Sequence, residues 1–151
     1  MGYVDETGIC STPDNRYAWT IKGQVHQVTA IRSKRVNIIG ALLSTGHFVT
    51  ACLQESVTGE YFYAYVMGVA KQIKEKYNIP LTLIVDNASI HKSKKMQAWR
   101  DLLEQDFNVR LYFLPPYSPE LNRIKMLWRS MKYQWREFKW MPTDEIVQWV
   151  N

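Results

Sequence analysis

The 151-residue sequence contains only two cysteines, Cys10 and Cys52, and their positions match neither a metal-binding nor a redox spacing. Two isolated cysteines favour a reducing compartment over a disulfide-stabilised secreted protein. No run of about 18 apolar residues occurs, which argues against a membrane-spanning helix. No basic start followed by an apolar stretch marks a secretory signal. We therefore expect a cytoplasmic protein with no membrane segment.

The residues that are present are typical of an ordinary soluble globular protein, with 46% hydrophobic and 22% charged residues. The length suits one domain better than two, so residues 1–151 are predicted to form a single domain. The net charge is +5, which is compatible with a polyanionic partner such as DNA. Many basic proteins bind no nucleic acid, so the charge alone leaves the partner open.

The apolar pattern changes its period along the chain. Early segments are rich in β-forming residues, and Ser44-Thr45 separates two of them as in a hairpin. Later, Phe62, Val66, Val69 and Ile73 recur at helical spacing. Strands are predicted at residues 2–5, 35–43, 46–54, 81–85 and 109–114, with a candidate hairpin arm at 17–25.

Helices are predicted at residues 60–77 and 93–105, and a third begins near Ser118 or Asn122, which are both credible N-caps. The third helix should run for at least four turns, because one apolar stripe continues along it. Its members are Ile124, Leu127, Trp128, Met131, Trp135 and Phe138. The resulting order predicts an α/β protein with one mixed sheet and helices packed on it.

Two aspartates are the first candidates for chemistry because each is expected at the end of a strand. Asp5 ends the first apolar segment, and Asp86 follows the continuous apolar run of residues 81–85. Sites in α/β folds collect at strand ends, and carboxylate oxygens are the ligands that Mg²⁺ prefers. Taken alone, Asp86-Asn87 is more typical of an ordinary polar turn.

Three sequence blocks change that interpretation. Residues 3–7 read Tyr-Val-Asp-Glu-Thr, and residues 83–93 read Leu-Ile-Val-Asp-Asn-Ala-Ser-Ile-His-Lys-Ser. Residues 113–128 read Phe-Leu-Pro-Pro-Tyr-Ser-Pro-Glu-Leu-Asn-Arg-Ile-Lys-Met-Leu-Trp. These blocks closely resemble those of mariner-like transposases, particularly their bacterial insertion-sequence relatives. The resemblance covers nearly the whole chain, and the two later blocks are long and specific.

The resemblance implies a ribonuclease H-like fold and an acidic triad that holds two Mg²⁺ or Mn²⁺ ions. One ion would activate water or a DNA 3′-hydroxyl, and the other would stabilise the leaving oxygen. Matched position by position, the first acid falls on Asp5 and the second on Asp86. The third falls on Lys125, where the family has Glu or Asp, and Arg123 stands where the family has Pro.

Lys125 is expected to weaken the metal site. A protonated ammonium has no lone pair for a metal and repels a cation. We therefore expect Lys125 to pair with Asp5 or Asp86, and the chain to cleave DNA weakly or not at all. Glu120 is not a substitute, since the family also carries an acid there, and Glu137 would lie roughly 18 Å farther along the helix.

Basic side chains near the expected site are candidates for contacting DNA phosphates. Lys125, Arg129, Lys132 and Arg136 recur at helical spacing beside the apolar stripe, although a solvated helix face explains this pattern as well. The candidate DNA-binding residues are Lys92, Lys94, Arg123, Arg129 and Lys132.

Three further residues are candidates for supporting the aspartates. His91 matches the family histidine and could orient a phosphate or a water, although a hydrogen-bonded structural role is at least as compatible. Glu6 would point away from Asp5 if the strand continues, and it could contact the surrounding ligands. Asn87 follows Asp86 directly.

The resemblance also implies partners and a location. The partners would be transposon-end and target DNA, with a homodimer as a further candidate, in a bacterial or archaeal nucleoid. The family normally carries helix-turn-helix modules before the first strand, so we expect an isolated catalytic domain. One alternative is a non-catalytic DNA-binding or interaction module that reuses the fold. Another is an unrelated basic α/β enzyme acting on a small molecule, although the 7 glycines form no phosphate-binding loop.

Overall fold

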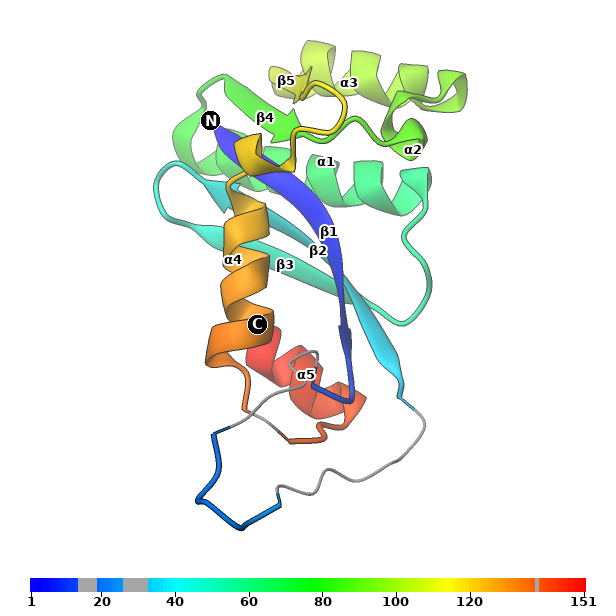
Figure 1. Cartoon of the computed structure of the whole chain (residues 1–151). Helices are drawn as coiled ribbons and strands as arrows, with labels where there is room; N and C mark the ends of the chain where they lie inside the picture. The colour runs from blue at the N-terminus through cyan, green and yellow to red at the C-terminus, as the bar shows by residue number, and fades with distance from the viewer. Residues whose placement is uncertain (14–18, 26–32, 138) are drawn as a thin grey trace.

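The computed structural model describes residues 1–13, 19–25, 33–137 and 139–151, and within them the chain forms a five-stranded mixed sheet (Figure 1). The strands follow the order β3-β2-β1-β4-β5. β1 pairs antiparallel with β2 and parallel with β4, while β3 is antiparallel to β2 and β5 is parallel to β4. The strands are β1 (Gly2–Cys10), β2 (Arg35–Leu43), β3 (Phe48–Leu53), β4 (Leu81–Val85) and β5 (Val109–Phe113).

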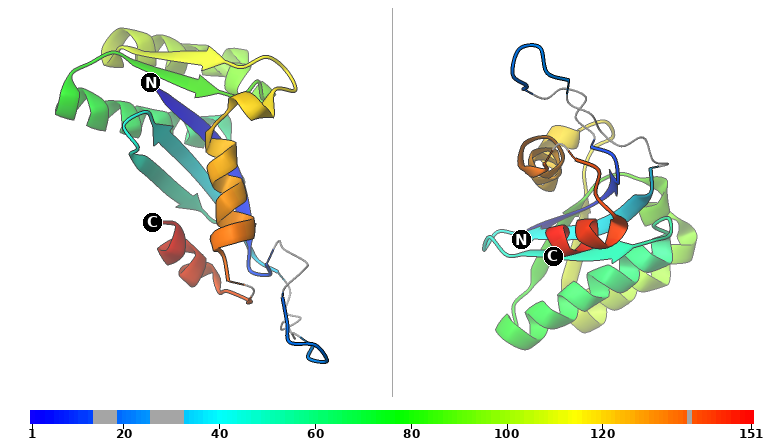
Figure 2. Two further views of the ribbon diagram at one scale, coloured as in Figure 1. Left: turned by 60° about the vertical axis from the view of Figure 1, so that its left-hand side comes forward. Right: turned by 90° about the horizontal axis from the view of Figure 1, so that it is seen from below.

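Helices cover both faces of this sheet (Figure 2). α1 (Gly59–Tyr77) and α3 (Gln97–Phe107) pack on one face, and α4 (Ile124–Ser130) and α5 (Thr143–Val150) pack on the other. Shorter elements complete the chain: α2 (Ser89–Lys92), η1 (Lys94–Met96), η2 (Pro119–Leu121) and the π-helical η3 (Met131–Trp135). None of the helices in the described ranges has the length and apolar character needed to cross a membrane.

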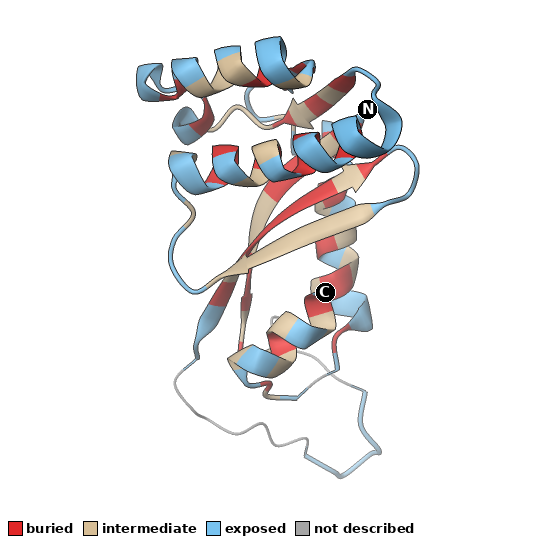
Figure 3. Ribbon diagram, turned by 180° about the vertical axis from the view of Figure 1, so that it is seen from behind, coloured by how far each residue is buried: buried red, intermediate tan, exposed pale blue. Residues whose placement is uncertain are grey.

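Each face of the sheet has its own apolar core, because side chains alternate along a strand (Figure 3). On β1, Val4 belongs to the core under α1 and α3, whereas Ile9 belongs to the core under α4 and α5. The mixed sheet with helices packed on it was predicted from the sequence, and the structure confirms it.

Helix α1 forms as its sequence predicts. Its apolar stripe, Phe62, Val66, Val69 and Ile73, is buried against the sheet. The side chain of Thr58 accepts a hydrogen bond from the backbone N–H of Tyr61 and caps the first turn. At the other end, Asn78 adopts the left-handed conformation that commonly ends a helix.

Strand β1 is longer than predicted, since it continues to Cys10 and places Asp5 inside the strand instead of at its end. Continuous pairing with β2, from Gly2 opposite Leu43 to Cys10 opposite Arg35, accounts for the extra length. Such pairing is tertiary, so a short apolar pattern cannot reveal it. Of the predicted hairpin arm at 17–25, residues 17 and 18 lie outside the described part, and residues 19–25 contain a turn and no strand.

Two predicted helices also differ from the structure. The helix predicted at 93–105 forms as η1 followed by α3, which continues to Phe107. The extended backbone of Ser93, with ψ of 148°, separates it from the short helix α2, which was not predicted. The last helix stops after Trp135, where the extended backbone of Arg136 breaks it, and Trp135 is exposed instead of buried. Phe138 lies outside the described residues, and α5 was not predicted.

Candidate functional site

Asp5 and Asp86 are neighbours because β1 and β4 run parallel. Tyr3 of β1 pairs with Ile84 of β4. Two residues farther along each segment, Asp5 therefore lies beside Asp86, which follows the last residue of β4. Asp5 is buried, with 3% of its surface exposed, and Asp86 is half-buried. The structure therefore brings together the two aspartates that the sequence singled out.

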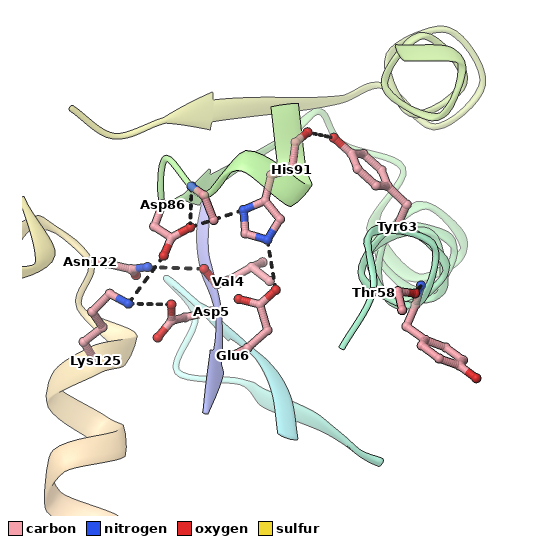
Figure 4. Close-up of polar contacts among 11 residues, drawn as sticks. Val4, Asp5, Glu6, Thr58, Tyr63, Asp86, His91, Asn122 and Lys125 are labelled. Carbon is pink, nitrogen blue, oxygen red and sulfur yellow. Dashed lines mark hydrogen bonds and ion pairs between the residues drawn. The ribbon is translucent and has the colours of Figure 1, made fainter. Parts of the chain in front are cut away.

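Helix α4 delivers Lys125 to the same place (Figure 4). Its ammonium nitrogen, Nζ, donates a hydrogen bond to Oδ1 of Asp5 at 2.6 Å and lies 3.7 Å from Oδ2 of Asp86. One cation thus bridges two carboxylates from two strands. Glu120 is exposed in η2, and Glu137 forms an ion pair with Lys139, so the structure assigns neither acid to this cluster.

Close packing at the start of α4 holds Lys125 in position. Gly40, which pairs with Asp5 across the sheet, leaves room for Trp128, because a β-carbon there would lie 2.6 Å from the indole ring. Asn122 is fully buried and donates a side-chain hydrogen bond to the backbone carbonyl of Val4 at 3.2 Å. Ser118 occupies the N-cap position of η2 but its side chain makes no capping hydrogen bond, and the N-cap position of α4 is taken by Arg123 instead of the predicted Asn122. The sequence signal for Asn122 was its place in the third block.

The ionisation of the cluster follows from burial and neighbouring charges. Burial raises the pKa of Asp5 to about 6, although the hydrogen bond and charge of Lys125 act in the opposite direction. Contact with His91 is the main cause that lowers the pKa of Asp86 to about 2. Burial disfavours the charged form of Lys125, but its hydrogen bond to Asp5 and the negative charges of Asp5, Asp86 and Glu6 together outweigh this and raise the lysine pKa. Lys125 therefore stays protonated at neutral pH.

His91 lies on the opposite face of β1 from Asp5 and is 1% exposed. Its Nε2 is 2.9 Å from Oε1 of Glu6, and its Nδ1 is 3.2 Å from Oδ1 of Asp86, an ionic contact without hydrogen-bond alignment. The imidazole also stacks on Phe62 at 4.0 Å between ring centres. Burial alone would lower the pKa of His91, but the two carboxylates raise it to about 9. The histidine links Glu6 to Asp86 and does not open to solvent.

The residues present do not fit a pair of divalent metal ions. The Lys125 ammonium lies between the two carboxylates, where it competes with any cation. Within the ranges that the structure describes, no three His, Cys, Asp or Glu side chains converge in a way that could hold a metal ion. The side chains that face one another are therefore suited to an internal ion pair.

An open hollow of about 480 Å³ lies beside this cluster. Asp86, Asn87 and Lys125 line one part, and the loop from Leu114 to Pro119 lines the rest. This wall includes Tyr117, whose only sequence signal was its place in the third block. The hollow exposes Asp86 and Lys125 to a ligand from solvent, whereas the buried Asp5 lies behind them and is not part of its lining. We call the pair of side chains Asp5 and Asp86 the Asp5–Asp86 edge.

Most of the predicted DNA-binding side chains reach the surface, where their role stays a prediction. Lys92, Lys94, Arg123 and Arg129 are exposed and Lys132 is half-buried. Arg136 does not extend the basic row, because it is buried and donates hydrogen bonds to the backbone carbonyls of Ser11 and Thr12.

The fold and the paired aspartates define an α/β domain of the ribonuclease H-like class. Its fold is similar to the Mos1 mariner paired-end complex with Mn, with a TM-score of 0.75 and 21% identity over 99% of this chain and 46% of that chain. The catalytic domain of Mos1 mariner transposase gives a TM-score of 0.67 at 17% identity, covering 99% of this chain and 66% of that chain.

Sequence comparison identifies the family. Residues 1–147 match the model of the DDE superfamily endonucleases, and the chain belongs to this family. The chain is 31% identical over 132 residues to an uncharacterised 39 kDa protein of insertion element IS630 from Shigella sonnei. That match covers 85% of this chain and 36% of the relative, so the chain spans about a third of the relative's length. The resemblance to mariner-like transposases and their insertion-sequence relatives is confirmed.

Proposed function

We propose that this chain is a transposase catalytic domain, formed by residues 1–151, that binds DNA at the Asp5–Asp86 edge and in which Lys125 suppresses strand cleavage. The observation that carries the proposal is the Lys125 ammonium, 2.6 Å from Asp5 and 3.7 Å from Asp86. The family match supports the reaction class. The position-by-position resemblance supports Lys125 as the counterpart of the third acid.

DNA is the proposed partner. Similar structures include the Mos1 transposase paired-end complex with left transposon end, and Mos1 complexes with Mg and Mn. In this chain we assign phosphate contacts to the exposed or half-exposed cations Lys92, Lys94, Arg123, Arg129 and Lys132. A homodimer and a place in the nucleoid stay predictions that accompany this assignment.

The side chains at the edge act mainly through their charges. Three carboxylates would present a charge of −3, whereas Asp5, Asp86 and Lys125 together present −1 when ionised. The remaining negative charge is too small, and the ammonium too close, for the edge to concentrate divalent cations strongly. Lys125 therefore stabilises the two carboxylates and leaves DNA binding to the surrounding basic side chains.

The test is the substitution Lys125→Glu, with Lys125→Gln as a control that removes the charge without adding a ligand. Nicking of supercoiled plasmid is measured with Mg²⁺ or Mn²⁺, and Mn²⁺ binding is measured by calorimetry. Lys125→Glu should bind Mn²⁺ and nick about 100-fold faster than the parent chain or more, since it restores an oxygen ligand. A parent chain that nicks as fast as Lys125→Glu contradicts the proposal.

The same ion pair also favours a second candidate function, a non-catalytic module that binds DNA. That function requires no metal and uses the fold as a scaffold. It predicts that Lys125→Glu binds Mn²⁺ and DNA yet shows no nicking. The nicking assay therefore separates the two candidates, because they differ only in whether the rest of the catalytic machinery is intact.

A further inference from the structure

One aromatic side chain stands at the rim of the hollow beside Asp86. Tyr117 is fully exposed, with a relative accessibility of 102%, in the loop that joins β5 to η2. Asp86, Lys125, Pro115 and Pro116 line the same hollow of about 480 Å³. A hollow of this size can accept a small organic group, and its wall combines apolar and charged surface.

The backbone at Tyr117 is strained. Its φ is +57°, in the left-handed region that bulky side chains seldom adopt. After a proline in a turn, glycine or asparagine is the usual residue with positive φ. In the described part of the chain the other non-glycine residues with positive φ are Asn78 and Asn108, two asparagines that end helices. Tyr117 alone combines this strain with an aromatic ring.

Packing does not account for the strain, because the exposed ring buries no surface in this chain. Strained residues that persist without a packing role occur at sites that contact ligands. Prolines 115, 116 and 119 restrict the backbone of the loop on both sides of Tyr117, so the loop presents the exposed ring at the rim of the hollow. The ring is therefore free to contact a ligand.

The surroundings indicate which ligand the ring would take. A tyrosine ring stacks on any nucleobase, and such stacking is a common means of holding single-stranded DNA. Pro115 and Pro116 add apolar surface beside the ring. Lys92 lies near β5, which leads into the loop, with its ammonium 4.9 Å from the centre of the Phe113 ring, and it supplies positive charge for a phosphate.

We propose that Tyr117 stacks on an unpaired nucleobase of a DNA strand whose neighbouring phosphate lies at the Asp5–Asp86 edge. The inference rests on the proposed function in one respect, that DNA is the ligand. The base must be unpaired, because a base inside a duplex has both faces covered by its neighbours. Tyr117 then positions the strand end and discriminates a frayed or single-stranded end from continuous duplex.

The test compares two DNA probes of equal length, a blunt duplex and a duplex with a single-stranded 3′ end. The second probe carries 2-aminopurine at its first unpaired position, and stacking on an aromatic ring quenches its fluorescence. Tyr117→Phe retains the ring, whereas Tyr117→Asn removes it and tolerates the left-handed backbone. Thermal unfolding should show that Tyr117→Asn is folded, with a midpoint at or above that of the parent chain.

The parent chain and Tyr117→Phe should bind the overhang more tightly than the blunt duplex and should quench the probe. Tyr117→Asn should lose the quenching and roughly 10- to 100-fold of its affinity for the overhang, with unchanged affinity for the blunt duplex. The stacking role is overturned if Tyr117→Asn binds the overhang as tightly as the parent chain does, or if it loses the same affinity for both probes. Either result leaves the proposed function standing. A parent chain that binds neither probe overturns the proposed function as well.

Discussion

Asp5 and Glu6 are consecutive residues, yet they face opposite sides of β1 and meet different cations. Asp5 contacts Lys125, whose side chain is 32% exposed, and Glu6 contacts His91, which is 1% exposed. His91 is fixed by stacking on Phe62 inside the core, whereas Lys125 reaches the edge on a long side chain from α4. This difference indicates that His91 belongs to the packed core, whereas we expect Lys125 to be replaceable without disturbing that core.

The largest expected effect is the contribution of the buried His91 to the pH dependence of the free energy of unfolding. In the folded state the pKa of His91 is about 9, above its ordinary value of 6.5. The stabilisation that protonated His91 gives the folded state is therefore fully present below pH 6.5 and is lost as pH rises through 9. Urea unfolding of metal-free protein should show a loss on the order of 3 kcal/mol over this window. His91→Gln should flatten the profile, and His47→Gln, at an exposed histidine, should not. A flat parent profile would contradict the burial of a charged His91.

Replacing the two aspartates by asparagine should have opposite effects on stability at pH 7. Asp5 has a raised pKa, so its contribution falls as pH rises from 3.8 through 6, and Asp5→Asn should stabilise by about 1–3 kcal/mol. Asp86 has a lowered pKa, so its contribution is present above pH 3.8 and is lost as pH falls through 2. Asp86→Asn should therefore destabilise the protein. Denaturant titrations of both variants check this, and changes of the same sign in the free energy of unfolding would contradict the opposite pKa shifts of the two aspartates.

The smallest expected effect distinguishes the exposed Arg129 from the buried Arg136. Arg129→Ala should weaken DNA binding a few-fold and reduce the slope of log affinity against log salt by about 1, since one phosphate contact is lost. Arg136→Ala should leave that slope unchanged and lower the unfolding midpoint, because Arg136 donates hydrogen bonds to the carbonyls of Ser11 and Thr12. A change of slope for Arg136→Ala alone would reverse the assignment of these two residues.

The sequence predicted the parts of this molecule that depend on local pattern. The apolar run before Asp86 forms β4, and the helical stripe from Phe62 to Ile73 forms the buried face of α1. The third block correctly indicated that Lys125 approaches the aspartates.

The sequence failed where tertiary contacts decide the structure. The length of β1 depends on pairing with β2, and the end of the last helix depends on a buried Arg136 bound to a distant loop. The contact of Asn122 with Val4 joins residues 118 positions apart, and no local pattern encodes it. The exposure and positive φ of Tyr117 likewise became visible only in three dimensions.

The most direct test of the account is a crystal structure of the parent chain soaked in Mn²⁺, compared with the Lys125→Glu variant treated identically. We expect the parent to show no anomalous peak between residues 5, 86 and 125, with the lysine ammonium still bridging the two carboxylates. The variant should show a peak within bonding distance of Asp5 and Asp86. An Mn²⁺ ion bound between the aspartates of the parent, with Lys125 turned away, would contradict the claim that this lysine takes the place of the metal.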